Sequence, residues 1–178
     1  MGSLVCGYSD GGQIALGMGL NYPRLAKAYV VGGADYRWSA EWLNFAKELG
    51  LDSPGTVDPE RAERNKPDIV NLVRERQDAY QGEGYWKTYL RQASFMWLAP
   101  MNYSVEDLRK IVDPSLILAG DRDDWFIPIE DAVHLYRSIP GSELAVAPGC
   151  THSLPFKNPA MLTNLALDFL LRHKSDPT

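Results

Sequence analysis

A serine between two glycines, directly after a short apolar run, is the feature that most constrains this chain. The apolar run predicts a short buried strand over residues 3–7, and residues 7–11 read Gly-Tyr-Ser-Asp-Gly. A helical stretch follows at once, so Ser9 stands at a helix N-terminus, where backbone amides favour negative charge. We expect glycine at Gly7 and Gly11 because a side chain at either position would collide in so sharp a turn.

The residues after this turn predict a βαβ unit. A helix is expected over residues 10–20, and residues 26–31 (Ala-Lys-Ala-Tyr-Val-Val) predict a second strand that ends at Gly32. A strand, a helix and another strand within about thirty residues favour parallel strands with a right-handed crossover. We therefore assign residues 1–33 to the core of an α/β domain.

A long stretch without a predicted strand follows, and we interpret residues 34–112 as a helical insertion. Helices are predicted at residues 38–49, 60–81 (interrupted at Pro67), 85–98 and 104–111, with a loop over 51–59. Aromatic residues in such helices are more typical of a core than of a substrate-binding wall; they include Trp42, Trp86, Phe95 and Trp97.

The α/β alternation returns in residues 113–178. Strands are predicted over 114–119 and 143–147, and helices over 128–138 and 159–173. The first of these strands is followed by Gly-Asp-Arg-Asp-Asp and the second by Pro-Gly-Cys-Thr-His. Because the carboxyl ends of parallel strands lie at one edge of a sheet, we expect Ser9, an aspartate and His152 to meet there.

Composition excludes several other classes of function. The chain has 178 residues, of which 45% are hydrophobic, and a net charge of −5 without a basic cluster, so neither nucleic acid nor a membrane is an expected partner. The two cysteines, Cys6 and Cys150, lack the spacing of a zinc site, so no metal is expected. We expect Cys6 to be buried on its strand and both to be free thiols in a reducing compartment, which favours a cytoplasmic protein.

Three stretches together resemble the α/β-hydrolase-fold serine hydrolases. Residues 7–12 resemble the nucleophile elbow of that superfamily, residues 118–123 the strand end that bears its acid, and residues 148–152 the loop that bears its histidine. The resemblance covers the C-terminal part of the fold, from the elbow onward. It implies an α/β fold with a parallel sheet of about four strands flanked by helices, in which residues 34–112 take the place of the cap.

The resemblance also assigns a role to each candidate residue. Ser9 would be the nucleophile, His152 the base that takes its proton, and an aspartate the group that orients the imidazole. The amide of Asp10 would donate one hydrogen bond to the oxyanion. No organic or metal cofactor is implied.

The choice of the aspartate depends on where the counting begins. Counting forward from Gly120 places the acid of the family at Asp123, whereas counting back from Pro128 places it at Asp124. We prefer Asp123, because the end of a strand fixes geometry more firmly than the loop after it. Asp121 is expected to cap or brace the turn.

The sequence before the elbow is short for this fold, and this shapes our expectations about partners. The strand over residues 3–7 would lie at an unpaired edge and leave an apolar patch exposed. We therefore expect an N-terminally truncated form, or a second copy or another polypeptide that covers the edge.

Two functions from different classes remain open at this point. The first is a serine hydrolase that cleaves a small carboxylic ester or a related acyl bond through an acyl-enzyme. The alternative is an inactive hydrolase remnant that acts as a binding or oligomerisation module. A carbon–carbon hydrolase or a cofactor-free haloperoxidase would use the same three residues, and nothing in the sequence favours either.

Overall fold

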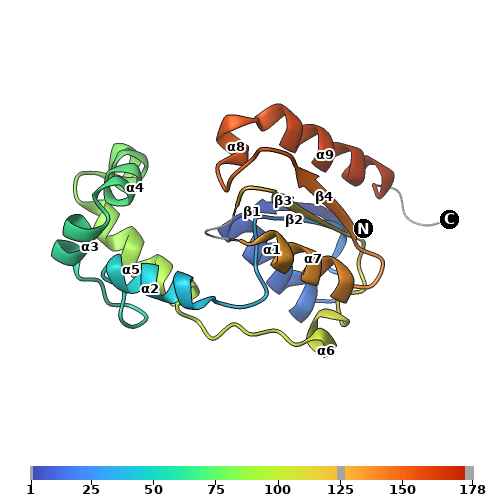
Figure 1. Ribbon diagram of the computed structural model, residues 1–178, viewed down its shortest axis with the longest axis horizontal. Coiled ribbons are helices and arrows are strands. Elements are labelled where there is room, and N and C mark those ends of the chain that lie inside the picture. Colours follow the sequence, from blue (N-terminus) through green and yellow to red (C-terminus); the bar gives the residue numbers. More distant parts are fainter. Residues whose placement is uncertain (1, 124–126, 175–178) are drawn as a thin grey trace. The chain divides into compact units, whose positions relative to one another are not determined.

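One parallel sheet forms the centre of the fold. The computed structural model describes residues 2–123 and 127–174, and its strands lie in the order β1 (Ser3–Tyr8), β2 (Ala26–Gly32), β3 (Ser115–Gly120) and β4 (Glu143–Ala147) (Figure 1). Each strand pairs in parallel with the next. The predicted fold class, a parallel sheet of about four strands flanked by helices, is confirmed.

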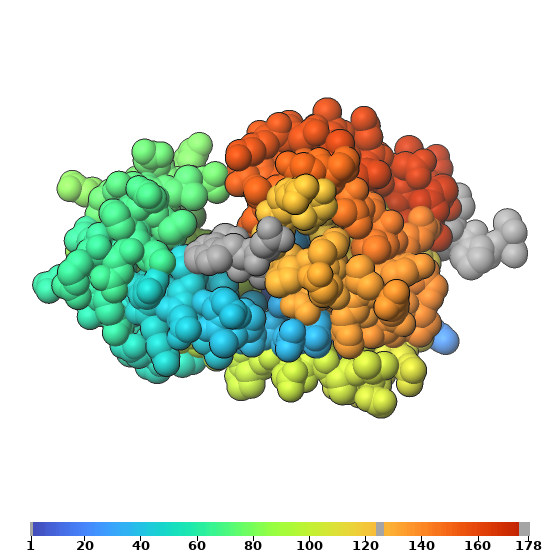
Figure 2. Space-filling view, in the orientation of Figure 1, coloured from blue at the N-terminus to red at the C-terminus, as the bar shows by residue number. Residues whose placement is uncertain are grey.

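Helices cover both faces of this sheet. Helices α1 (Asp10–Asn21) and α7 (Ile129–Ser138) pack on one face, and α8 (Leu154–Lys157) and α9 (Pro159–Arg172) on the other (Figure 1). The outer sides of α7 and α9 are at the surface (Figure 2).

The strand residues alternate between two cores, as a sheet covered on both faces requires. In β2, Tyr29 and Val31 belong to the cluster beneath α1 and α7, whereas Val30 belongs to the cluster beneath α8 and α9. In β3, Ile117 and Leu118 divide between the clusters in the same way.

Strand β1 lies at one edge of the sheet formed by the described residues. Three of its six residues are exposed, among them Cys6, whereas all of β3 is buried. The expectation that Cys6 is buried is therefore wrong. Within the described residues, β1 pairs with β2 and with no other strand. The core beneath α8 and α9 consists mainly of residues from β2, β3 and β4.

Residues 38–101 form a second compact unit made of helices. They are α2 (Ala40–Glu48), α3 (Pro59–Asn65), α4 (Pro67–Gln81) and α5 (Tyr85–Trp97). Pro67 opens α4 and separates it from α3, because a proline is tolerated in the first turn of a helix and disrupts its interior.

The indole rings of this unit bind backbone carbonyls or fill its core. Trp42 donates its Nε1–H to the carbonyl of Trp97 at 3.1 Å, and Trp86 is 2% exposed. Phe95 is 60% exposed.

The short helix α6 (Val105–Leu108) belongs to the first unit, where Leu108 packs in the core beneath α1 and α7. None of the described helices is long and apolar enough to cross a membrane.

Candidate active site

Ser9 occupies a strained turn between β1 and α1. Its φ is +56° and its ψ is −120°, a backbone conformation that residues other than glycine rarely adopt. The turn is fastened by backbone hydrogen bonds on both sides. The Ser9 amide donates to the carbonyl of Gly32 at 2.9 Å, and the Gln13 amide donates to the carbonyl of Ser9 at 2.9 Å. The side chain of Ser9 is thereby presented at the carboxyl end of the sheet.

Two glycines give this turn its room: Gly7, as expected, and Gly12 in place of Gly11. A Cβ at Gly7 would lie 2.0 Å from the carbonyl oxygen of Gly11, and a Cβ at Gly12 would lie 2.3 Å from that of Gly32. Both distances exclude any side chain. A Cβ at Gly11 meets nothing within 4 Å, so the expected collision at Gly11 is wrong. Gly12 allows α1 to approach the end of β2.

His152 lies between Ser9 and Asp123. Its Nε2 is 2.8 Å from the Ser9 Oγ, and its Nδ1 is 2.7 Å from the Asp123 Oδ2. Asp123 is 3% exposed, whereas the imidazole of His152 is partly open to solvent. The structure thus brings together the three side chains that the sequence singles out. Asp124, the other candidate for the acid, lies outside the described residues.

The loops that carry Asp123 and His152 are tied to each other. Asp121 accepts a hydrogen bond from the Cys150 amide at 3.2 Å through its Oδ1, and the Arg122 amide donates to the carbonyl of Cys150 at 2.9 Å. Gly120 is the point of closest approach, since a Cβ there would lie 2.2 Å from the Cys150 carbonyl oxygen. These contacts fix the two loops two residues before the acid and two before the histidine.

Asp10, whose amide is the expected oxyanion donor, is the first residue of α1. It follows Ser9 directly, so its amide belongs to the helix terminus at which Ser9 stands. Its role in binding an oxyanion stays a prediction.

A buried carboxylate, Asp35, lies near the nucleophile turn and was missed in the sequence. Its side chain accepts a hydrogen bond from the Tyr36 amide at 2.6 Å, and its own amide donates to the Gln13 Oε1 of α1 at 2.8 Å. Burial, and then the charge of Asp131, raise the pKa of Asp35 to about 7. Arg37 contacts Asp131 at 3.4 Å. No motif or spacing marks Asp35, because its partners come from α1 and α7.

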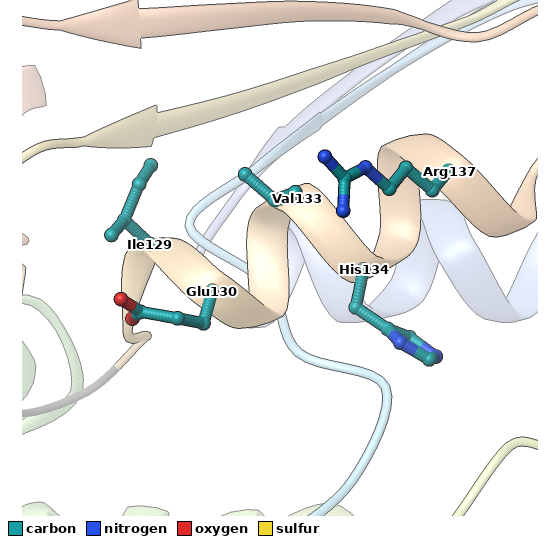
Figure 3. Close-up of a pocket in the computed structure, with 5 residues that line it drawn as sticks. All are labelled: Ile129, Glu130, Val133, His134 and Arg137. Atoms are coloured by element: carbon teal, nitrogen blue, oxygen red, sulfur yellow. The ribbon is translucent and has the colours of Figure 1, made fainter.

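A hollow of about 310 Å³ lies along α7, and none of the three candidate residues lines it. Figure 3 shows its walls, which come from a single helix: Ile129, Glu130, Val133, His134 and Arg137. Within residues 2–123 and 127–174 there is no group of three or more His, Cys, Asp or Glu side chains placed to hold a metal ion.

The sequence of residues 2–164 matches the alpha/beta hydrolase family. The chain belongs to this family. The resemblance found in its motifs is thereby confirmed, together with the hydrolase fold. A search of curated proteins finds no match.

Solved structures of hydrolases share the fold of this family member. An alpha/beta hydrolase from a Medee basin deep-sea metagenome library is 21% identical, with a TM-score of 0.66 over 99% of this chain and 68% of that one. A meta-cleavage product hydrolase from Pseudomonas fluorescens IP01 is 21% identical, with a TM-score of 0.68 over 94% and 64%. An enol-lactonase from Burkholderia xenovorans LB400 is 17% identical, with a TM-score of 0.68 over 93% and 64%. The chain therefore spans about two thirds of the length of these neighbours.

Proposed function

We propose that this chain is a serine hydrolase that cleaves a small carboxylic ester or a related acyl bond through an acyl-enzyme. The observation that carries the proposal is the continuous line of hydrogen-bonding groups from Asp123 through His152 to Ser9. With a proton on Nδ1, the imidazole donates to Asp123 and leaves Nε2 to accept the proton of the Ser9 hydroxyl.

The first half of the proposed reaction forms the acyl-enzyme. The Ser9 Oγ attacks the carbonyl carbon of the substrate while His152 takes the hydroxyl proton, a step that general-base catalysis accelerates about 10²–10⁴-fold. The resulting oxyanion accepts a hydrogen bond from the Asp10 amide, a contact worth about 3 kcal/mol. The tetrahedral intermediate then collapses, and the alcohol leaves with the proton held by His152.

The second half releases the acid. A water molecule gives a proton to His152 and attacks the acyl carbon, and the new tetrahedral intermediate expels the Ser9 Oγ, which takes the proton back. Asp123 stabilises the imidazolium formed in both halves. Its burial suits this role, because a charge with little access to water interacts strongly with the imidazolium beside it.

The names of the structural neighbours bear on the substrate class of this proposal. One neighbour is an enol-lactonase, and a lactone is a cyclic ester, which agrees with acyl chemistry. Another is a meta-cleavage product hydrolase. We propose an ester or lactone as the substrate because Ser9, His152, Asp123 and the Asp10 amide together provide the groups that its cleavage needs.

The second candidate is an inactive remnant that binds a partner through its first strand. The position of β1 at the edge of the described sheet, with half of its residues exposed, favours this candidate. The edge of a strand can pair with a strand of another chain. The two candidates differ in one observable, the reactivity of Ser9.

Labelling with a fluorophosphonate probe, followed by intact-mass measurement, tests the proposal. A single adduct is expected on the wild-type chain and none on Ser9→Ala. Ser153→Ala is the matched control, since that serine stands next to His152, and its side chain makes no helix-capping hydrogen bond at the start of α8. Its labelling should equal that of the wild type. Absence of an adduct on the folded wild-type chain would leave the second candidate.

A further inference from the structure

Tyr8, the residue before the nucleophile, lies flat against the end of the neighbouring strand. A Cβ at Gly32 would lie 2.6 Å from its Cδ2, and a Cβ at Gly33 would lie 2.8 Å from its Cε1. The ring therefore covers the backbone of these two glycines, where no side chain could stand beneath it. This packing fixes the ring at the carboxyl end of the sheet, beside the turn that carries Ser9.

A side chain at Gly33 would also meet His152. A Cβ there would be 3.2 Å from the Cε1 of the imidazole, so Tyr8 and His152 both lie over the side of Gly33 that a side chain would occupy. Their ring centroids are 5.5 Å apart at an interplanar angle of 52°, within the range of favourable aromatic contacts. Tyr8 thus packs beside the imidazole.

The hydroxyl of Tyr8 contributes little to this packing. Its oxygen is buried and has no hydrogen-bond partner among the described residues. Burial, and then the negative charge of Asp123, raise the pKa of the phenol, so the side chain stays neutral. The aromatic ring is therefore the part of Tyr8 that acts on its surroundings.

We propose that Tyr8 is a positioning residue for His152, whose ring keeps the imidazole in the plane that serves both of its hydrogen bonds. This inference rests on the proposed function. Nδ1 must face Asp123 while Nε2 faces Ser9. These two hydrogen bonds alone do not prevent the imidazole from rotating about the axis through its two nitrogens. The Tyr8 ring on one side and the Gly33 backbone beneath restrict that motion.

Three substitutions separate the ring from the hydroxyl and from general packing. Tyr8→Phe removes only the unpartnered hydroxyl, and Tyr8→Leu removes the ring. Tyr8→Met replaces the ring by a flexible apolar side chain that fills much of the same volume. Tyr22→Leu is the control for the loss of a tyrosine, since Tyr22 is 62% exposed after α1.

Two measurements read the state of His152. One is the far-downfield proton resonance of an Nδ1–H hydrogen bonded to a carboxylate, which does not require activity. The other is the rate of fluorophosphonate labelling across pH. We expect Tyr8→Phe and Tyr22→Leu to keep the resonance and a rate within twofold of wild type. Tyr8→Leu and Tyr8→Met should lose at least tenfold in rate and broaden the resonance while their circular dichroism stays native.

The outcomes distinguish this inference from the proposed function. A wild-type chain that keeps the resonance and does not react with the probe would contradict the proposed function, and the resonance of the variants would still test Tyr8. A folded Tyr8→Leu or Tyr8→Met with the wild-type resonance would overturn the inference. Unfolding of both variants would also overturn it, because Tyr8 would then act by general packing.

Discussion

The two sides of the candidate site are held by different sets of contacts. On the side of Ser9, the nucleophile side, α1 approaches the ends of β1 and β2 so closely that neither Gly7 nor Gly12 has room for a Cβ, and backbone hydrogen bonds hold Ser9. On the other side, the loops bearing Asp123 and His152 are joined partly by a side-chain carboxylate, that of Asp121. Both sides thus combine close backbone approach with backbone hydrogen bonds, and the side of Asp123 and His152 differs in depending also on a side-chain carboxylate.

This difference predicts different sensitivities. A close backbone contact tolerates changes of pH and salt and does not tolerate one added methyl group. A hydrogen bond to a partly exposed carboxylate tolerates a change in the shape of the side chain but requires an acceptor atom at the same place. Substitutions can therefore be chosen that affect one side and spare the other.

The largest expected effect follows from a methyl group on the nucleophile side. Gly12→Ala places a Cβ 2.3 Å from a backbone oxygen, so α1 must move away from β2, and we expect unfolding to become easier by more than about 3 kcal/mol. Gly11→Ala is the matched control, because nothing lies within 4 Å of its Cβ. That variant should be as stable as wild type or more so, by up to about 1 kcal/mol, since alanine favours a helix.

Urea unfolding followed by circular dichroism measures both variants. Equal losses for Gly11→Ala and Gly12→Ala would contradict the steric account of the nucleophile side. The same comparison can be repeated with Gly7→Ala, which we expect to behave like Gly12→Ala.

The next effect concerns the ionisable group on the nucleophile side. The folded pKa of Asp35 is raised above its unfolded value, so the unfolded chain gives up this proton first as pH rises. The stability cost begins near pH 4, grows to about pH 7 and is constant above it. The free energy of unfolding of Asp35→Asn, which carries no charge, should equal that of wild type near pH 4 and exceed it by up to about 4 kcal/mol at pH 8.

Thermal unfolding across this pH range measures the difference between Asp35→Asn and wild type. Asp68→Asn, at an exposed position on α4, is the control for the loss of a carboxylate. The comparison is sharpened if probe labelling of Ser9 is the same in Asp35→Asn and wild type, because packing would then hold the turn whatever the charge of Asp35. A difference in melting temperature that does not change between pH 4 and pH 8 would contradict the role given to Asp35.

The smallest effect is expected on the side of the acid and base. Asp121→Leu removes the acceptor of the Cys150 amide, and we expect probe labelling to slow about threefold to tenfold as the two loops loosen, a cost of about 1 kcal/mol. Asp121→Asn keeps an oxygen at the same place and should remain within twofold of wild type. Labelling rates measured at several pH values test both. Labelling of Asp121→Leu at the wild-type rate would show that the hydrogen bond from the Arg122 amide to the Cys150 carbonyl is enough to hold the two loops together.

Most of the fold was predictable because local patterns and parallel topology point to the same arrangement. Strands β2, β3 and β4 end at, or directly before, the glycines and the proline that predict their ends, whereas β1 continues one residue past Gly7. The break at Pro67 separates α3 from α4. Helix α8 was missed, since its four residues are too few for a periodic pattern and include Pro155. Cys6 was misjudged because its burial depends on what lies beside β1 rather than on the strand itself.

The candidate site also has a part that local patterns predict and a part that they do not. Ser9, His152 and Asp123 follow strand ends, which sequence reasoning locates well. The need for Gly12, the burial of Asp35 and the contact of Tyr8 with His152 arise between segments distant in the chain, and no local pattern encodes them. The three side chains were therefore foreseeable, and the contacts that hold them were not.

The hydrogen bond between Ser9 and His152 joins positions 143 residues apart. At about 5–20 residues per second, a ribosome would complete the nucleophile turn on the order of 10 s before the histidine. During synthesis the serine would be an ordinary hydroxyl without a base. Because His152 follows β4, which pairs with β3, the imidazole would reach Ser9 only after this strand has joined the sheet. Reactivity would then arrive with the last strand of the described sheet, and probe labelling would report when that strand is in place.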